Sequence, residues 1–408
     1  MANIKAFKGL RPRKDIVQHV AELPYDVVTS DEARKITENN NYSFYHITKP
    51  EVDLPPSVDQ YDPQVYKKGL ENLEEFISSG VLQYDENPCL YLYTLVMGDR
   101  SQTGLVTCIN IDDYLNNTVK KHELTREDKE IDRMTHVDVL SAQTGLVYLL
   151  YNEDGTVTRH FQQALSIEPV YDYTARDGIR HIIRVIDDPG MVNDFISSFS
   201  GIDLYIADGH HRAASAVKAG LKRREQNPDA PADAEYNFFL GVIFPHDQLR
   251  IMAYNRAVRD LNGLSSSGFI SKVEAHYSME KSDISTPAKK NTVCMYIDRQ
   301  WYLLTPKFEI PDDPIESLDV RMLQNKILDP VLGIKNPRTD KRIDFIGGIK
   351  GAEELARIVD NGDFAVAFSM YPTSVEDLMN VSDSGGIMPP KSTWFEPKLR
   401  SGLIIHRI

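Results

Sequence analysis

The chain has 408 residues, of which 41% are hydrophobic and 26% are charged, a composition typical of a globular protein with room for two or three domains. Its 60 acidic residues outnumber its 46 lysines and arginines, and the net charge of −14 argues against broad, non-specific binding of nucleic acid. The three cysteines are widely spaced, and the sequence has no apolar signal segment and no membrane-length apolar run. We therefore expect a cytoplasmic protein without a disulfide framework, a cysteine zinc site or a membrane partner.

The first predicted segment, residues 1–87, is expected to form an N-terminal α/β extension. Its opening residues favour a strand that ends at Pro12. A helix capped by Thr29 or Ser30 follows, with acidic residues in its first turn. After a proline-rich acidic loop, apolar residues at helical spacing predict a second helix, which Gly80 closes.

Residues 88–261 form the predicted core. Two strands come first, followed by a charged helical stretch. The run 144–161 is expected to fold as a hairpin with Asp154 and Gly155 at its turn. Strand and helix patterns continue through residues 262–408, which are expected to form a separate C-terminal α/β domain. The predicted fold class is therefore α+β.

The stretch from Leu204 to Gly220 combines a short apolar run, a polar turn and an alanine-rich helix. The apolar run suits a buried strand, and Gly220 is expected to end the helix. A strand that passes through glycine into a helix leaves backbone N–H groups unpaired at the helix start, and these groups attract anions, phosphate above all. The side chains of the turn add further donors. The residues of this predicted phosphate cradle are Asp208, Gly209, His210, His211 and Arg212.

Two other interpretations of the turn stay open. An Asp-Gly pair also makes an ordinary turn, with Arg212 on the surface. A metal ion shared by His210 and His211 is disfavoured, because adjacent side chains at a helix start point about 100° apart and no HExxH or HxH pattern occurs. A Mg²⁺ ion carried by nucleotide phosphates, with Asp208 nearby, is the expected metal.

A second chemistry-bearing stretch begins at His122 and Glu123 and ends near Arg133. The simplest interpretation is the solvated face of a charged helix. A glutamate is nevertheless a suitable general base for a hydroxyl when it lies within hydrogen-bond reach.

A third stretch lies near the C-terminus, where two prolines precede a lysine and two hydroxyl side chains. Such a stiff loop suits either a structural turn or a grip on phosphate or carboxylate. Its polar residues are Lys391, Ser392 and Thr393.

Taken together, the three stretches resemble the free-serine kinases with a ParB/sulfiredoxin-like fold. The segment KHEL (Lys121–Leu124) is similar to the one that carries the catalytic glutamate of that family, and LYIADGHHR (Leu204–Arg212) is similar to the one that binds its nucleotide phosphates. The segment PPKST (Pro389–Thr393) resembles its late PKTT segment. The whole chain more closely resembles domain-of-unknown-function family one-thousand-and-fifteen, through LRP…LPYDVVTSDEAR, HELT…DR, ADGHHR and PPKSTWFEPKL.

The resemblance implies a ParB/sulfiredoxin-like core and a small-molecule kinase. Such an enzyme would transfer a phosphoryl group from ATP or ADP, with Mg²⁺, to the hydroxyl of free L-serine or a similar acceptor. Glu123 and Asp208 would be catalytic, with Asp208 also near the Mg²⁺ ion, and Gly209–Arg212 would bind the nucleotide phosphates. The implied substrate-binding residues are His122, Arg133, Lys391, Ser392 and Thr393.

Three alternatives remain beside the kinase. One is a nucleotide-binding switch or sensor without turnover, and another is a DNA-associated ParB-like protein, which the acidic net charge opposes. The third is sulfiredoxin-like repair, which needs a cysteine beside the arginine turn, where this chain has His210 and His211 instead.

Overall fold

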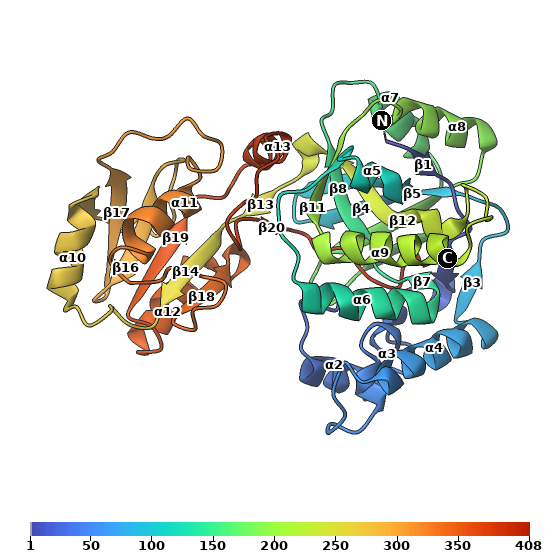
Figure 1. Ribbon diagram of the computed structural model, residues 1–408, viewed down its shortest axis with the longest axis horizontal. Coiled ribbons are helices and arrows are strands. Elements are labelled where there is room, and N and C mark those ends of the chain that lie inside the picture. The colour runs from blue at the N-terminus through green and yellow to red at the C-terminus, as the bar shows by residue number, and fades with distance from the viewer. Residues whose placement is uncertain (1) are drawn as a thin grey trace. The chain divides into compact units, whose positions relative to one another are not determined.

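The computed structural model describes residues 2–408, which form two compact units of mixed α and β structure (Figure 1). Unit 1 comprises the chain up to Leu249 together with Pro397–Ile408, and unit 2 comprises Arg250–Glu396. The structure therefore has two units, whereas the sequence predicted three domains. The N-terminal residues belong to the same unit as the predicted core, and the last twelve residues return to that unit.

Unit 1 is built on a nine-stranded sheet in which strand order is β6-β11-β8-β12-β5-β4-β10-β9, with β1 paired to β5. Two small pairs, β2 with β3 and β7 with β21, complete its strands. The strands are β1 (Ile4–Lys5), β2 (Leu10–Pro12), β3 (Leu82–Tyr84), β4 (Leu90–Met97), β5 (Arg100–Asn110), β6 (Val119–Lys120), β7 (Ala142–Gln143), β8 (Val147–Tyr151), β9 (Tyr171–Thr174), β10 (Arg180–Ile186), β11 (Leu204–Asp208), β12 (Phe238–Pro245) and β21 (His406–Arg407).

The helices of unit 1 pack on this sheet and on one another. Helix α9 contacts β8 and β12, α6 lies against α9, and α4 lies against α6 (Figure 1). The helices are α1 (Val17–Val20), α2 (Ser30–Thr37), α3 (Tyr45–Thr48), α4 (Pro63–Ser78), α5 (Ile111–Leu115), α6 (Glu127–Leu140), α7 (Thr158–Ala164), α8 (Pro189–Ser198) and α9 (His210–Gln226).

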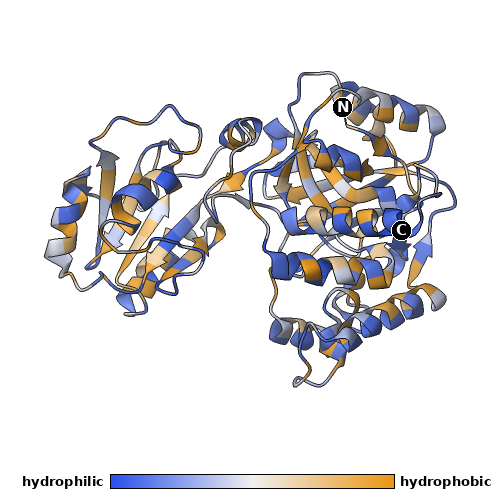
Figure 2. Ribbon diagram, viewed as in Figure 1, coloured by the Kyte–Doolittle hydropathy of each residue, from blue (hydrophilic) through white to orange (hydrophobic). Residues whose placement is uncertain are grey.

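The main core of unit 1 lies between the sheet and helices α7, α8 and α9. Alternate residues of the central strands, such as Leu149, Leu204 and Ile206, join Phe195 and Ala213 of the helices in one buried cluster. Figure 2 shows the hydrophobic residues concentrated along these strands. The alternation explains why one face of each strand is covered by the helices.

The N-terminal residues share a second hydrophobic cluster with the rest of unit 1. Leu10, Phe44 and Leu73 pack in it together with Leu140 of α6 and Ile405 near the C-terminus. Because this apolar surface is buried only when all these segments meet, residues 1–87 do not have a separate core.

Unit 2 contains a six-stranded antiparallel sheet of order β15-β17-β16-β19-β14-β18, and a two-stranded pair of β13 and β20. Helix α12 packs on this sheet through Leu355 and Ile358. The elements are β13 (Ile251–Met252), β14 (Tyr254–Val258), α10 (Ser266–Glu274), β15 (Tyr277–Lys281), β16 (Val293–Ile297), β17 (Gln300–Pro306), α11 (Asp319–Leu323), β18 (Ile343–Gly347), α12 (Gly351–Asp360), β19 (Val366–Met370), α13 (Val375–Asp383) and β20 (Trp394–Phe395).

Two local predictions are wrong. The run 144–161 is not a hairpin, because β8 pairs with β11 and β12, and Asp154-Gly155 leads into helix α7. Gly220 does not end helix α9, which continues to Gln226. Glycine at this position instead allows the helix to pack closely, since a Cβ there would lie 2.4 Å from the carbonyl oxygen of Tyr236.

Among residues 2–408, no helix combines the length and the apolar composition that a membrane span requires.

Candidate functional site

The two central sequence stretches meet at one edge of the large sheet. Strands β6 and β11 pair in parallel, with Val119 opposite Leu204 and Lys120 opposite Tyr205. Parallel strands end at the same edge, so the residues that follow β6 and β11 emerge side by side. His122 comes two positions after β6, and His210 comes two positions after β11. This register explains why segments almost 90 positions apart share a site.

Gly209 forms the turn between β11 and α9. Its φ angle of 93° lies in the left-handed region, which glycine adopts at little cost. As the N-cap of α9 it offers no side chain to the N–H groups of the first helical turn. The backbone N–H of Gly209 itself donates to Asp208 Oδ1 at 2.7 Å. The next N–H groups precede the first helical hydrogen bonds and are therefore suited to an anion. The predicted strand, turn and helix start are all present.

The Asp208 carboxylate lies between two cationic side chains. Lys398 Nζ lies 3.0 Å from Asp208 Oδ2, and Arg212 Nη2 lies 4.0 Å from Asp208 Oδ1. Burial opposes the charged form of Asp208, but the positive charges of Lys398 and Arg212 outweigh it and lower its pKa. Asp208 is therefore a fixed anion among cations, and it orients these groups at the start of α9.

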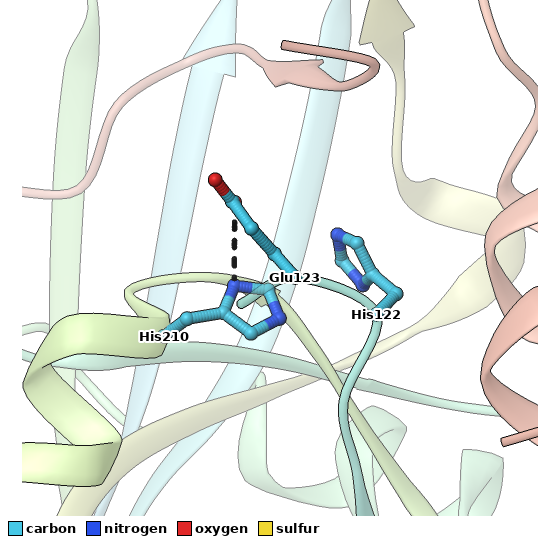
Figure 3. A group of neighbouring side chains, drawn as sticks. All are labelled: His122, Glu123 and His210. Atoms are coloured by element: carbon cyan, nitrogen blue, oxygen red, sulfur yellow. Dashed lines mark ion pairs between the residues drawn. The ribbon is translucent and has the colours of Figure 1, made fainter. Parts of the chain in front are cut away.

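His122, Glu123 and His210 form a compact cluster (Figure 3). His210 Nδ1 lies 3.8 Å from Glu123 Oε2, and the rings of His122 and His210 meet edge to face, with centroids 4.5 Å apart. Both histidines are buried, whereas the Glu123 side chain is 44% exposed. Burial lowers the pKa of His122 to about 4, and burial together with His122 lowers the pKa of His210 well below its usual value. Both rings are therefore neutral at neutral pH.

Arg212 and Arg133 line a cavity of unit 1. Arg212 donates one hydrogen bond to the carbonyl of Leu146, and its Nε is buried without a hydrogen-bond partner among the described residues. Arg133 forms an ion pair with Asp132 at 2.8 Å, and its guanidinium lies 4.3 Å from the ring centre of Tyr25. Tyr25 also lines the cavity, so the N-terminal segment supplies part of its wall.

His211 does not belong to the cluster of His122, Glu123 and His210 and has a different environment. Burial lowers its pKa, while the carboxylates of Asp26 and Glu130 act in the opposite direction.

The predicted residues of the C-terminal loop belong to unit 2. Within that unit, Ser392 Oγ donates to the carbonyl of Pro389 at 2.7 Å, and the carbonyl of Lys391 accepts from Arg256 at 3.0 Å. Lys391 adopts a positive φ of 58°, and Thr393 leads into β20. Their proposed role over a substrate stays a prediction.

Two residues of the site were given no role from the sequence, although both lie in stretches that carry the family resemblance, Tyr25 in LPYDVVTSDEAR and Lys398 in PPKSTWFEPKL. Lys398 stands only seven positions after Lys391, yet it belongs to unit 1 and contacts Asp208. Tyr25 lines the cavity, and its ring centre lies 4.3 Å from the Arg133 guanidinium. Both contacts join distant parts of the chain, and neither residue type is specific for a site.

The comparison with protein families supplies one match. A family model described as "Protein of unknown function (DUF1015)" matches residues 4–321. The family resemblance stated from the sequence is thereby confirmed. No curated protein resembles the sequence closely enough to count as a match.

Several solved structures show weak similarity. A free serine kinase variant in complex with AMP has a TM-score of 0.36 and 12% identity, over 71% of this chain and 87% of that one. A conserved hypothetical protein from Pyrococcus furiosus has a TM-score of 0.35 and 13% identity, over 72% and 93%. SbnI from Staphylococcus aureus, truncated at its C-terminus, has a TM-score of 0.38 and 10% identity, over 71% and 82%. Similarities this low do not establish a shared fold.

Proposed function

The chain belongs to the family described as Protein of unknown function (DUF1015), and from its site we propose that it is a small-molecule kinase. It transfers a phosphoryl group from ATP or ADP to the hydroxyl of free L-serine or a similar small acceptor, on a ParB/sulfiredoxin-like core in the cytoplasm. One observation carries the proposal: the Glu123 carboxylate lies 3.8 Å from His210, the first residue of helix α9, whose first N–H groups are suited to bind phosphate.

The proposed reaction divides the work between these groups. The first N–H groups of α9, with Arg212 and Lys398 nearby, hold and neutralise the phosphates of the nucleotide. Glu123 accepts the proton of the acceptor hydroxyl as its oxygen attacks the terminal phosphorus, and the bond between that phosphorus and the nucleotide breaks. Phosphoryl transfer requires mainly positioning and charge neutralisation, which this arrangement is suited to supply.

The cavity beside Arg212 supports an acceptor that carries a carboxylate. Arg133 and Arg212 both line it, and planar guanidinium groups bind carboxylates with paired hydrogen bonds. A free amino acid with a hydroxyl side chain has both the carboxylate and the acceptor oxygen. Tyr25 would then cover the acceptor from the N-terminal segment.

The metal that this reaction implies is Mg²⁺, which would neutralise the phosphate charge when it is bound to the nucleotide. Asp208 already accepts hydrogen bonds from Lys398 and from the N–H of Gly209. A direct contact between Asp208 and Mg²⁺ would cost these bonds, so the arrangement fits an ion carried mainly by the phosphates.

The test is an assay of the full-length protein with L-serine, MgCl₂ and either ATP or ADP, in which O-phosphoserine is measured by mass spectrometry. Threonine, homoserine and glycerol serve as comparison acceptors. We expect Glu123→Gln to lower kcat by about 10²–10⁴-fold, the usual contribution of a general base, with little change in nucleotide affinity. Glu127→Gln, which alters an exposed glutamate in the first turn of α6, is the matched control.

Equal rates for the wild type and Glu123→Gln would disprove the assignment of the base. Nucleotide binding without transfer to any acceptor would favour a switch or sensor instead. A thiol mechanism of the sulfiredoxin type is disfavoured, because burial raises the pKa of Cys89 and Cys294 to about 11 and raises that of Cys108 well above its usual value.

A further inference from the structure

We propose that His122, Glu123 and His210 form a binding site for a divalent transition-metal ion of the zinc class. One ligand atom from each residue lies within 4.8 Å of the other two. Two imidazoles and one carboxylate are a common set of three protein ligands for Zn²⁺, with a fourth position open to water or substrate. The proposal concerns metal binding and does not depend on kinase activity.

His122 offers a nitrogen atom that no other group uses, because its Nδ1 is buried and has no hydrogen-bond partner among residues 2–408. His210 directs its Nδ1 toward Glu123 at 3.8 Å, so Nδ1 is the nitrogen that it would offer to an ion shared with that carboxylate. The histidines themselves are only 2% and 6% exposed. An unpartnered polar atom at this depth costs free energy, which coordination to an ion would recover.

Glu123 completes the set from the solvent side. In Figure 3 its side chain stands beside the His210 ring, and the 3.8 Å separation from Nδ1 is joined by the dashed line. Ligands of a tetrahedral zinc ion lie about 3.4 Å apart, so the 3.8 Å pair must close by about 0.4 Å and no pair of the group by more than about 1.4 Å. The Glu123 side chain is 44% exposed and is the least enclosed of the three ligands.

The choice of ligands favours zinc over magnesium. Mg²⁺ prefers six oxygen ligands, whereas imidazole nitrogen selects Zn²⁺ and its neighbours in the first transition series. The ion would also be bound by the Glu123 carboxylate, which we assign as the general base. Glu123 could therefore not accept a proton while it binds zinc.

The test uses metal-free, full-length protein titrated with Co²⁺, whose visible absorption reports four-coordinate binding, followed by displacement with Zn²⁺. We expect one ion per chain with the spectrum of mixed nitrogen and oxygen ligands, unaffected by a large excess of Mg²⁺. Glu123→Gln should weaken Zn²⁺ binding by more than about tenfold, since loss of even an outer-shell partner costs 10–100-fold. His122→Ala should abolish the visible spectrum.

His211→Ala is the matched control, because it removes the adjacent histidine but none of the three ligands. It should leave the Co²⁺ spectrum and the Zn²⁺ affinity unchanged. Identical spectra and affinities for the wild type, His122→Ala and Glu123→Gln would overturn the proposal, as would displacement of Co²⁺ by Mg²⁺. If His122→Ala does not fold, as judged by circular dichroism, Glu123→Gln decides the outcome, because its position is exposed.

Discussion

The ion pair between Lys398 and Asp208 joins residues 190 positions apart at the start of helix α9. The Lys398 side chain is 15% exposed and that of Asp208 is 32% exposed, so the pair is only partly screened by water. Because Asp208 also faces Arg212, removal of Lys398 leaves one cation to balance the carboxylate. The pKa of Asp208 should then rise toward its ordinary range.

We expect Lys398→Met to lower the free energy of unfolding by about 1–2 kcal/mol, an amount between that of an exposed and of a buried pair. If the protein binds nucleotide as we propose, nucleotide affinity should fall as well, because a cation near the proposed phosphate site is lost. Lys222→Met is the control, since Lys222 pairs with Asp138 at the surface and is 46% exposed. Calorimetric unfolding and titration with ADP measure the two effects. Equal losses for the two variants would contradict a special role for Lys398.

Individual site residues differ in how far the sequence reveals them. The residues from Asp208 to Arg212 are recognisable because strand, glycine and helix follow one another directly. Glu123 can be identified only through the resemblance to the free-serine kinases, since its local sequence pattern also fits the solvated face of a helix. Lys398 and Tyr25 act through contacts that only the tertiary structure creates.

Helix α9 depends on a close approach that its own propensity does not predict. Gly220 lies inside the helix, where alanine would ordinarily be preferred by about 1 kcal/mol. A Cβ at this position, however, would lie 2.4 Å from the carbonyl of Tyr236 and 2.8 Å from Ile111 Cδ1. The helix must therefore move away from its neighbours to accept any larger residue.

We expect Gly220→Ala to destabilise the protein by about 1–3 kcal/mol, the usual cost of overpacking, in spite of the better helix former. Gly190→Ala in the first turn of α8 is the comparison, because the nearest atom to its Cβ is a side-chain oxygen of Asp188 at 3.2 Å. The midpoint of thermal unfolding measures both. A Gly220→Ala protein as stable as the wild type would show that the contact with Tyr236 yields easily.

Elements whose partners are adjacent in sequence were predicted better than those whose partners are distant. The strand, turn and helix of β11 and α9 follow from local pattern, and so does the helix capped by Thr29. Strand β8 was assigned a neighbouring partner because a turn follows it. Its true partners are β11 and β12, more than 50 positions away, and an apolar strand contains no signal that selects them.

The two units of the molecule can be followed separately, because both tryptophans, Trp301 and Trp394, belong to unit 2. Asp319, at the start of α11 in the same unit, is 8% exposed. Burial raises its pKa to about 7. Between about pH 4 and pH 7, the Asp319 carboxyl therefore stays protonated in the folded unit, whereas in the unfolded chain it is ionised.

The contribution of Asp319 to the free energy of unfolding of unit 2 should consequently be fully present below about pH 4. It should be lost as the pH rises through about 7. A shift of this size corresponds to at most about 4 kcal/mol. Asp319→Asn should remove this dependence. Urea unfolding followed by tryptophan fluorescence at pH 5 and pH 8 checks the prediction. The same difference between the two pH values in the wild type and in Asp319→Asn would rule out Asp319 as its source.

The interruption of unit 1 by unit 2 has a consequence for the order in which the protein is made. Lys398 and Ile405, which contact Asp208 and the N-terminal cluster, leave the ribosome after the whole of unit 2. During translation, Asp208 in the α9 turn and the segment around Glu123 are synthesised before Lys398, whose charge balances the Asp208 carboxylate. The site therefore matures late, and a nascent chain stalled within residues 250–396 still lacks the Lys398 contact on which the proposed nucleotide site depends.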